Sequence, residues 1–392
     1  MPISRLLVKM AGHVIAVGNY DYATPLFERG MSIDGKDPNG STALQYVAVL
    51  SVAQHDRAER ERADVFFREQ LRKKNPQISE PQIEQMRKFL LAKSFLTMTY
   101  TNKAFPFPVT CEVPFIFKYL MPQLGEKLPK FREFSDLIDK LINREDVALP
   151  HGKNLTVMVS NIDCHASYFA IESAALDVVP TAVYYIDGAN VFPIPDVDGL
   201  CFGAAKYQLE KGLYSDVNGV RGFLSQITTS DYDELKGELE VITMEDEEPA
   251  TFIPLPKQTR DTCEMKSFTT LLRLLNMLAN NRELRLDQGV VSGEGYDAYK
   301  EFKYEMIKLC TDIVVTEALD EKSPSCLKAQ KFLSEQIAPN VERKVEEQER
   351  EETLQLAQYV IEKVNLVLPK SSPKKVSSDH LDHDSRGSGV SA

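Results

Sequence analysis

Apolar residues recur at helical spacing in several long segments, and this pattern constrains the fold more than any other feature of the sequence. In SEPQIEQMRKFLLAKSFLTMTY, residues 79–100, Ser79 and Gln82 also have the spacing of a capping box, so a helix should begin there. The same periodicity predicts helices within segments 56–75, 115–124, 131–146, 263–284 and 296–319.

One region has a different pattern. Residues 154–163 alternate and are β-branched, which predicts a strand, and TAVYYIDG, residues 181–188, predicts a second strand. Residues 164–179 between them are expected to form a helix capped by Asp163. A strand–helix–strand unit over 155–190 would allow a parallel βαβ arrangement.

These elements predict a fold that is mainly α with a small α/β portion. We expect two lobes: a helical lobe over 1–150, and a mixed α/β and then helical lobe over 151–368 that ends in a long exposed helix. The polar, Ser-rich tail, 369–392, has little to bury and should be disordered. Prolines interrupt 105–114 and 249–261, which are expected to be an extended connector and a linker.

Composition excludes several classes of protein. No apolar run approaches the roughly 18 residues that span a bilayer, and Lys9, Gly12 and His13 interrupt the apolar N-terminus, so neither a membrane span nor a secretory signal is expected. The six cysteines have no C-x-x-C spacing and are interpreted as thiols of a reducing compartment. We therefore expect a cytoplasmic protein.

Charge is unevenly distributed. The net charge of −12 argues against a dominant nucleic-acid-binding surface, but residues 57–132 hold 15 Lys and Arg against 8 Asp and Glu. These residues predict a basic face that could contact phosphates, with Tyr100, Phe105 and Phe107 able to stack on bases. The candidate phosphate contacts are Arg57, Arg68, Arg72, Lys73, Lys74, Arg87, Lys88, Lys118, Lys127, Lys130 and Arg132. A solvated helix face with mixed charges is the alternative interpretation.

A repeat-like pattern covers residues 18–48. Matches to a repeat motif occur at Gly18, Leu26, Phe27, Gly30, Asp34, Asp37, Gly40, Thr42, Leu44 and Ala48. On these residues the segment resembles a single ankyrin repeat. The resemblance implies that Thr42 caps the next helix and that Leu44 and Ala48 pack inside it.

The same resemblance implies protein–protein binding, with Asp37, Asn39 and Gln45 as candidate contacts. The segment departs from the family at Pro25, inside the expected second helix, and at Gln45, where the family usually has His. The period does not continue over 1–17 or 49–75. An unrelated helix–turn–helix with an Asp-Pro-Asn-Gly turn is the alternative interpretation.

Motifs for catalysis or cofactor binding are absent from the sequence. GEG at 293–295 lacks both the third glycine of a dinucleotide loop and the GK[ST] of a P-loop, so no cofactor is expected. Asp163, Cys164 and His165 follow a predicted strand, and Asp187 ends the next one, where two carboxylates could hold Mg²⁺. Turn-forming aspartates are the simpler interpretation, and no metal is expected.

Three functions remain. The leading hypothesis is a non-enzymatic structural or interaction protein that acts through protein contacts and self-associates. The first alternative is an RNA-coating protein of viral nucleocapsid type that uses the basic face. The second is an enzyme built on the 155–190 unit.

Overall fold

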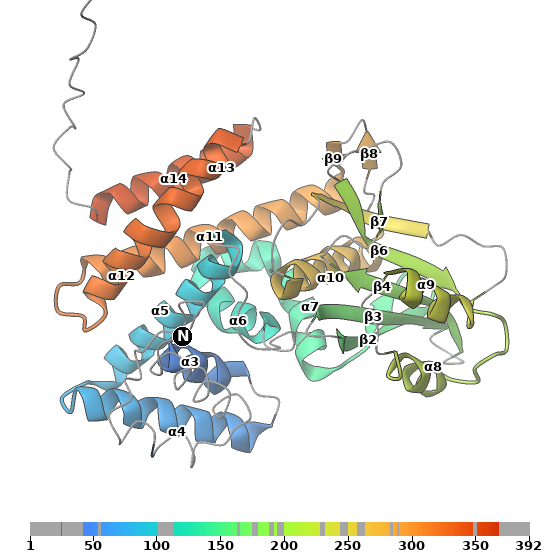
Figure 1. Ribbon diagram of the computed structural model, residues 1–392, viewed down its shortest axis with the longest axis horizontal. Coiled ribbons are helices and arrows are strands. Elements are labelled where there is room, and N and C mark those ends of the chain that lie inside the picture. Colours follow the sequence, from blue (N-terminus) through green and yellow to red (C-terminus); the bar gives the residue numbers. More distant parts are fainter. Residues whose placement is uncertain are drawn as a thin grey trace, which may run out of the picture.

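The computed structural model describes the chain over residues 25, 42–53, 56–100, 113–162, 165–174, 179–187, 192–193, 200–227, 232–243, 250–256, 263–282, 285–287, 290–347 and 351–367. Within these ranges the protein is mainly helical with a small sheet portion, as the sequence predicted. Figure 1 shows the helices gathered towards one end of the molecule and the main sheet towards the other. The predicted tail, the connector residues 105–112 and most of segment 18–48 lie outside the described ranges.

Helices dominate the N-terminal part of the chain. They are α3 (Ala43–Ala53), α4 (Arg57–Lys74), α5 (Glu80–Tyr100), α6 (Val113–Leu120), the 3₁₀ segment η1 (Met121–Phe131) and α7 (Arg132–Asn143). One half of the expected capping box at the start of α5 is confirmed, since Gln82 Oε1 accepts hydrogen bonds from the Ser79 amide at 2.9 Å and from its hydroxyl at 3.1 Å. Thr42 Oγ1 accepts from the Gln45 amide at 3.2 Å, so Thr42 caps α3 as expected.

Burial shows which face of α4 contacts the core. Val65 is 54% exposed, whereas Phe67 is fully buried. The helix presents Phe66, Phe67 and Leu71 to the core, which places Val65 on the solvent face. Leu44 and Ala48 of α3 are buried, as the repeat-like pattern implied.

The described strands form a seven-stranded antiparallel sheet in the order β1-β2-β3-β4-β6-β5, with β7 also pairing with β6. The strands are β1 (Val147–Leu149), β2 (Lys153–Ile162), β3 (His165–Ala174), β4 (Pro180–Asp187), β5 (Phe192–Pro193), β6 (Leu200–Gln208) and β7 (Ala250–Pro256). A separate two-stranded sheet joins β8 (Arg285–Asp287) to β9 (Val290–Ser292). β7 falls where a proline-rich linker was expected, so that prediction is wrong for 250–256.

The predicted strand–helix–strand unit is also wrong. Residues 165–174 form β3, which pairs antiparallel with β2 from Ile162↔His165 to Lys153↔Ala174. β3 then pairs antiparallel with β4. The unit is therefore a meander of three strands, and it offers no parallel strand ends at which Asp187 and a second carboxylate would meet.

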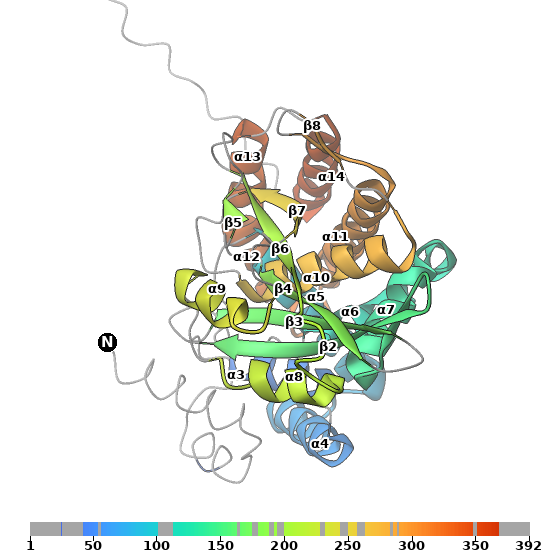
Figure 2. The same ribbon diagram turned by 90° about the vertical axis from the view of Figure 1, so that its right-hand side faces the viewer.

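Helices cover both faces of the main sheet (Figure 2). On one face, Phe169, Ile171 and Val183 pack with α8 (Val217–Leu224) and α9 (Tyr232–Glu240). On the other face, Tyr168, Ala170 and Tyr184 belong to the larger core with α10 (Cys263–Ala279). The alternation of side chains along β3 accounts for this division, because successive residues point to opposite faces.

The long helix α11 (Glu294–Leu319) runs from the sheet end of the molecule to the far helical end (Figure 1). It packs against α5, α10 and η1, so the larger core includes residues from both sides of the boundary expected near 150. Phe134 of α7 stacks on Phe302 of α11 with ring centroids 4.6 Å apart. The expected lobes thus share one continuous apolar core in the part of the chain that the structure describes.

The C-terminal described elements are α12 (Cys326–Phe332), the π-helical segment η2 (Leu333–Ile337), α13 (Ala338–Glu347) and α14 (Glu351–Val367). A long exposed helix was expected here, and that prediction is wrong. α13 and α14 pack against each other, and α14 also packs on α11. Val360 and Val364 of α14 are buried, so this helix has an apolar face that belongs to the larger core.

Candidate functional site

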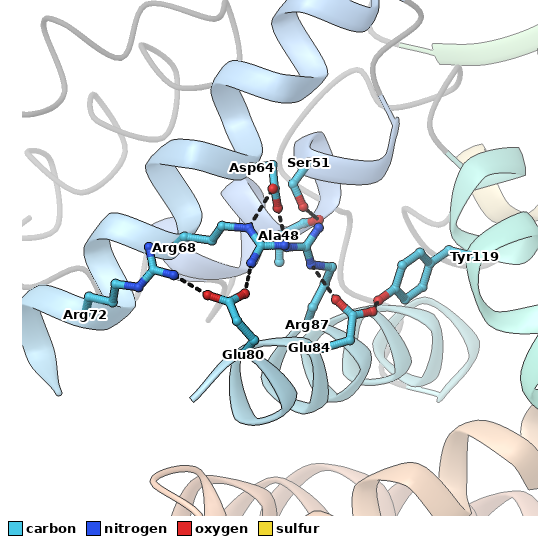
Figure 3. A network of polar contacts seen from close by, with 9 residues as sticks. All are labelled: Ala48, Ser51, Asp64, Arg68, Arg72, Glu80, Glu84, Arg87 and Tyr119. Carbon is cyan, nitrogen blue, oxygen red and sulfur yellow. Dashed lines mark hydrogen bonds and ion pairs between the residues drawn. The ribbon is translucent and has the colours of Figure 1, made fainter. Parts of the chain in front are cut away.

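Most of the predicted phosphate contacts are engaged with other side chains of the fold. Figure 3 shows the central network, in which Arg68 bridges Asp64 and Glu80, and Arg72 shares Glu80. Arg87 of α5 is only 5% exposed and contacts Asp64 and, at 3.5 Å, Glu84. The guanidinium of Arg87 also lies 5.1 Å from the ring of Phe67. This arginine stabilises the packing of α4 on α5 and does not face solvent.

Asp64 is the common acceptor in this network. Burial would raise the pKa of its carboxyl, but hydrogen bonds from Arg68 and Arg87 outweigh burial and hold that pKa below its usual value. Glu84 extends the network by accepting from Tyr119 Oη. The network therefore ties α4, α5 and α6 together.

Two of the predicted lysines connect distant parts of the chain. Lys127 Nζ lies 2.6 Å from Glu305 Oε2, and Lys130 pairs with Glu301. Both lysines belong to η1 and both glutamates to α11. These ion pairs join the elements on either side of residue 150, at the rim of the shared core.

Six predicted contacts remain. Contacts within the fold occupy four of them: Arg57 with Glu61 at 2.8 Å, Lys118 with Asp139 at 2.5 Å, Arg132 with Asp136 at 4.0 Å, and Lys88 with Gln123 at 3.1 Å. Lys73 and Lys74 are exposed at the C-terminus of α4. Tyr100 is 4% exposed and packs in the core, so it does not form a stacking surface here. Phe105 and Phe107 lie outside the described residues.

Lys74 lies beside another lysine. Desolvation, followed by the charge of Lys328 on α12, lowers the pKa of Lys74 to about 8. The pKa of Lys328 is also lowered, chiefly by desolvation. Positive charge is thus concentrated where the end of α4 meets α12.

The predicted protein-binding residues are Asp37, Asn39 and Gln45. Asp37 and Asn39 lie outside the described ranges. Gln45 is 1% exposed, and its Nε2 donates to Ser94 Oγ at 2.8 Å. In this arrangement Gln45 fixes α3 against α5 and contacts no external surface.

A polar cluster that the sequence did not predict lies on the main sheet. Glu172 of β3 is 3% exposed and accepts from Lys153 Nζ at 2.7 Å, Lys206 Nζ at 3.0 Å, Tyr184 Oη at 3.0 Å and Thr181 Oγ1 at 3.1 Å. Burial would raise the pKa of Glu172, but these contacts together lower it to about 2. In a strand over 165–174, Glu172 lies on the same face as Tyr168 and Ala170, because alternate residues of a strand point to the same side.

The hydrogen bonds of the Glu172 cluster serve the fold, because they join β3 to Lys153, β4 and β6. A carboxylate with four donors is fully hydrogen-bonded, so it has no acceptor position left for a substrate proton. Asp187, the other candidate carboxylate on this sheet, is 2% exposed and accepts from Tyr185 Oη at 3.1 Å. Asp163 and Cys164 lie outside the described ranges. Among the described residues, no group of three or more His, Cys, Asp or Glu side chains is placed to hold a metal ion.

An exposed apolar pair lies where α11 turns into α12. Leu327 is 79% exposed and Leu319 is 52% exposed. The residues just before them in sequence are in contact, because Cys326 Sγ donates to the Ala318 carbonyl at 3.1 Å. Leu319 and Leu327 each directly follow a residue of this contact, and we call the surface formed by this contact and the two exposed leucines the α11–α12 corner.

A scan against protein-family models finds no match for the chain, and a search of curated proteins finds no significant relative. Within the described part of the chain, no helix has both the length and the apolar character required to cross a bilayer.

Proposed function

We propose that this chain is a non-enzymatic interaction protein that acts through protein contacts and associates with a second copy of itself. The α11–α12 corner carries the proposal. Large apolar side chains that remain mostly exposed and are flanked by charge are typical of protein interfaces.

The charges around the corner favour self-association over binding to an unrelated protein. Asp320 and Glu321 lie close enough to Cys326 to help raise the pKa of its thiol, after burial as the main cause. Lys328 follows Leu327 directly. Both signs of charge thus flank one apolar centre, and a two-fold interface, which pairs a patch with itself, requires such a self-complementary surface.

The corner can be tested by placing charge at its centre. We expect Leu319→Glu with Leu327→Glu to shift the chain to monomer and to leave the unfolding midpoint nearly unchanged, because both side chains are already exposed. Light scattering on a size-exclusion column measures the mass. Val241→Glu is the matched control, since Val241 is 72% exposed beyond α9. A wild-type chain that is monomeric at all concentrations, or an oligomer that survives the double substitution, would refute the proposal.

The RNA-coating alternative has one observation in its favour, which is the approach of Lys74 to Lys328. A phosphate group between two ammonium groups would relieve their repulsion. If this alternative holds, Lys73→Gln with Lys74→Gln should weaken binding of single-stranded RNA. The slope of log K against log salt should fall by about 1.4, because each phosphate contact on a single strand contributes about 0.7.

Fluorescence anisotropy with a labelled oligonucleotide measures both quantities. Lys211→Gln with Lys236→Gln is a matched loss of two positive charges away from the predicted basic face. An equal effect of the two double variants would show that any binding depends on net charge and not on the basic face.

The cellular location that accompanies the leading proposal is the cytoplasm, and the free thiols of Cys310 and Cys326 support it.

A further inference from the structure

Arg273 of α10 is a buried cation with unused donors. Arg273 is 7% exposed, and neither its Nε nor its Nη2 has a hydrogen-bond partner among the described residues. Burial lowers its pKa, yet arginine remains charged in proteins. A buried charge without a partner is costly, so proteins normally pair such a group.

A third unused donor lies one turn further along the same face of α10. Asn276 is fully buried, and its Nδ2 has no partner within the described structure. The orientation of this amide is fixed, because its Oδ1 accepts from Arg282 Nη1 at 2.8 Å. Arg282 is itself held by Glu133 at 2.7 Å. Arg273 and Asn276 therefore present three N–H donor groups and no matching acceptor.

The guanidinium of Arg273 lies against two aromatic rings at the start of α11. Its Cζ lies 5.4 Å from the ring centroid of Tyr296 and 5.5 Å from that of Tyr299. Lys300 Nζ lies 5.6 Å from the same Tyr296 ring, so two cations flank it. Tyr299 is buried whereas Tyr296 and Lys300 are partly exposed, so the aromatic side chains beside Arg273 include both a buried ring and one at the surface.

The first turn of α11 adds to the positive potential. The N-terminus of this 26-residue helix is not capped by a side chain, because the residue before it is Gly293, with φ of 114°. The partial positive charge of a helix N-terminus favours an anion nearby. The acidic residues of this turn, Glu294 and Asp297, are exposed, and neither pairs with the unused atoms of Arg273.

We propose that Arg273 and Asn276 form a binding site for an oxyanion, a carboxylate or a phosphate, between α10 and the first turns of α11. Nε and Nη2 are the two nitrogens of the guanidinium edge that binds both oxygens of one carboxylate or phosphate group side by side. That whole edge is unused, and Asn276 Nδ2 supplies a further donor. The site is remote from the α11–α12 corner along α11, and the proposal does not depend on self-association.

The test compares thermal unfolding of the full-length wild type and Arg273→Met in sodium chloride, sodium acetate and sodium phosphate at equal ionic strength. Circular dichroism suits the measurement because the chain has no tryptophan. In chloride, Arg273→Met should be at least as stable as wild type, since it removes an unpaired buried charge and keeps the apolar stem. In acetate or phosphate, only the wild type should gain a saturable increase in midpoint.

The two anions distinguish the sources of the ligand group: a response to acetate indicates a carboxylate ligand and a response to phosphate a phosphorylated one. Arg273→Lys keeps the charge without the two-pronged edge, so it should weaken binding by about tenfold or more. Arg132→Met, which removes an exposed arginine of α7, should respond as wild type does. Phosphate also stabilises proteins by exclusion from their surface, but that effect is common to all variants.

Three results would overturn the proposal. In the first, neither anion raises the wild-type midpoint more than chloride does. In the second, Arg273→Met responds to the anions as fully as wild type. In the third, Arg273→Met unfolds or loses stability in chloride. That result would show that a carboxylate of the chain itself balances the charge of Arg273 in the wild type.

Discussion

Glu172→Gln is expected to lower the free energy of unfolding by about 3 kcal/mol, the low end for breaking a buried ion pair. The substitution leaves Lys206, whose side chain is 16% exposed, without its counter-charge. Lys153 is 44% exposed on its side chain and can turn to solvent, which limits the loss. Urea unfolding followed by circular dichroism measures the change, and against a typical stability of about 5 to 15 kcal/mol it is large.

Two further variants make this expectation specific. Glu210→Gln changes an exposed glutamate that follows β6 and should stay within about 0.5 kcal/mol of wild type. Tyr184→Phe removes one of the four donors and should cost about 1 kcal/mol. A Glu172→Gln chain as stable as wild type would show that the lysines do not depend on this carboxylate.

The same carboxylate gives stability a pH dependence of definite sign. In the folded chain the pKa of Glu172 is lowered to about 2, whereas an unfolded glutamate titrates near about 4.3. The contribution of Glu172 is therefore complete above about pH 5 and is lost as pH falls towards 2. Between about pH 6 and pH 3 the wild type should lose more stability than Glu172→Gln, so the two unfolding curves should converge on acidification.

Arg87→Met is expected to lower the free energy of unfolding by about 2 kcal/mol. Removing one partner of a buried pair usually costs more, but Asp64 keeps Arg68 and its side chain is 27% exposed. The methionine retains apolar contact with Phe67, so the loss reports mainly on charge. Chemical unfolding measures it, and Arg57→Met, at an arginine 84% exposed on its side chain, should leave the unfolding curve unchanged.

The Arg87→Met variant also distinguishes two interpretations of the basic residues in 57–132. They either stabilise the fold or form a face that binds RNA. If Arg87 serves the fold, Arg87→Met should weaken the packing of α4 on α5, and its effect should not be additive with that of Asp64→Leu, since both remove the same contact. A stable Arg87→Met chain that lost affinity for RNA would instead support the nucleocapsid-type alternative.

Local signals predicted the helices well. Ser79 and Gln82 predicted the start of α5, because capping acts within a few residues of sequence. The apolar spacing of Phe268, Leu271 and Leu272 predicted α10 for the same reason, and all three side chains are fully buried.

The error at 165–174 has a clear physical cause. β3 is covered by helices on both faces, so Phe169, Ala170 and Ile171 are all buried in a continuous run. Such a run lacks the alternation of a half-exposed strand, and periodicity alone cannot distinguish it from a buried helix. Residues 165–174 form a strand because they pair antiparallel with β2 and β4, and this pairing depends on residues elsewhere in the chain.

The candidate sites were less predictable still, because their partners are distant in sequence. Lys127 pairs with Glu305, which lies 178 positions later in the sequence. A count of charged residues assigns Lys127 to a basic face because it does not include this distant partner. Arg273 looks like an ordinary polar position in the core helix α10, and its unused donors become visible only when Tyr296 and Tyr299 are in place.

The position of α11 in the core also bears on how the chain folds during its synthesis. Phe95, Phe117 and Phe134 lie early in the chain, and Phe117 and Phe134 pack on Phe302 of α11. The ribosome makes the chain from its N-terminus, so the first helices emerge before the surface that covers them exists. Phe117 and Phe134 therefore gain their native contacts with Phe302 only after the sheet and α11 have been made. Until then these aromatic side chains lack part of their native cover, and transiently exposed apolar surface of this kind is what chaperones bind.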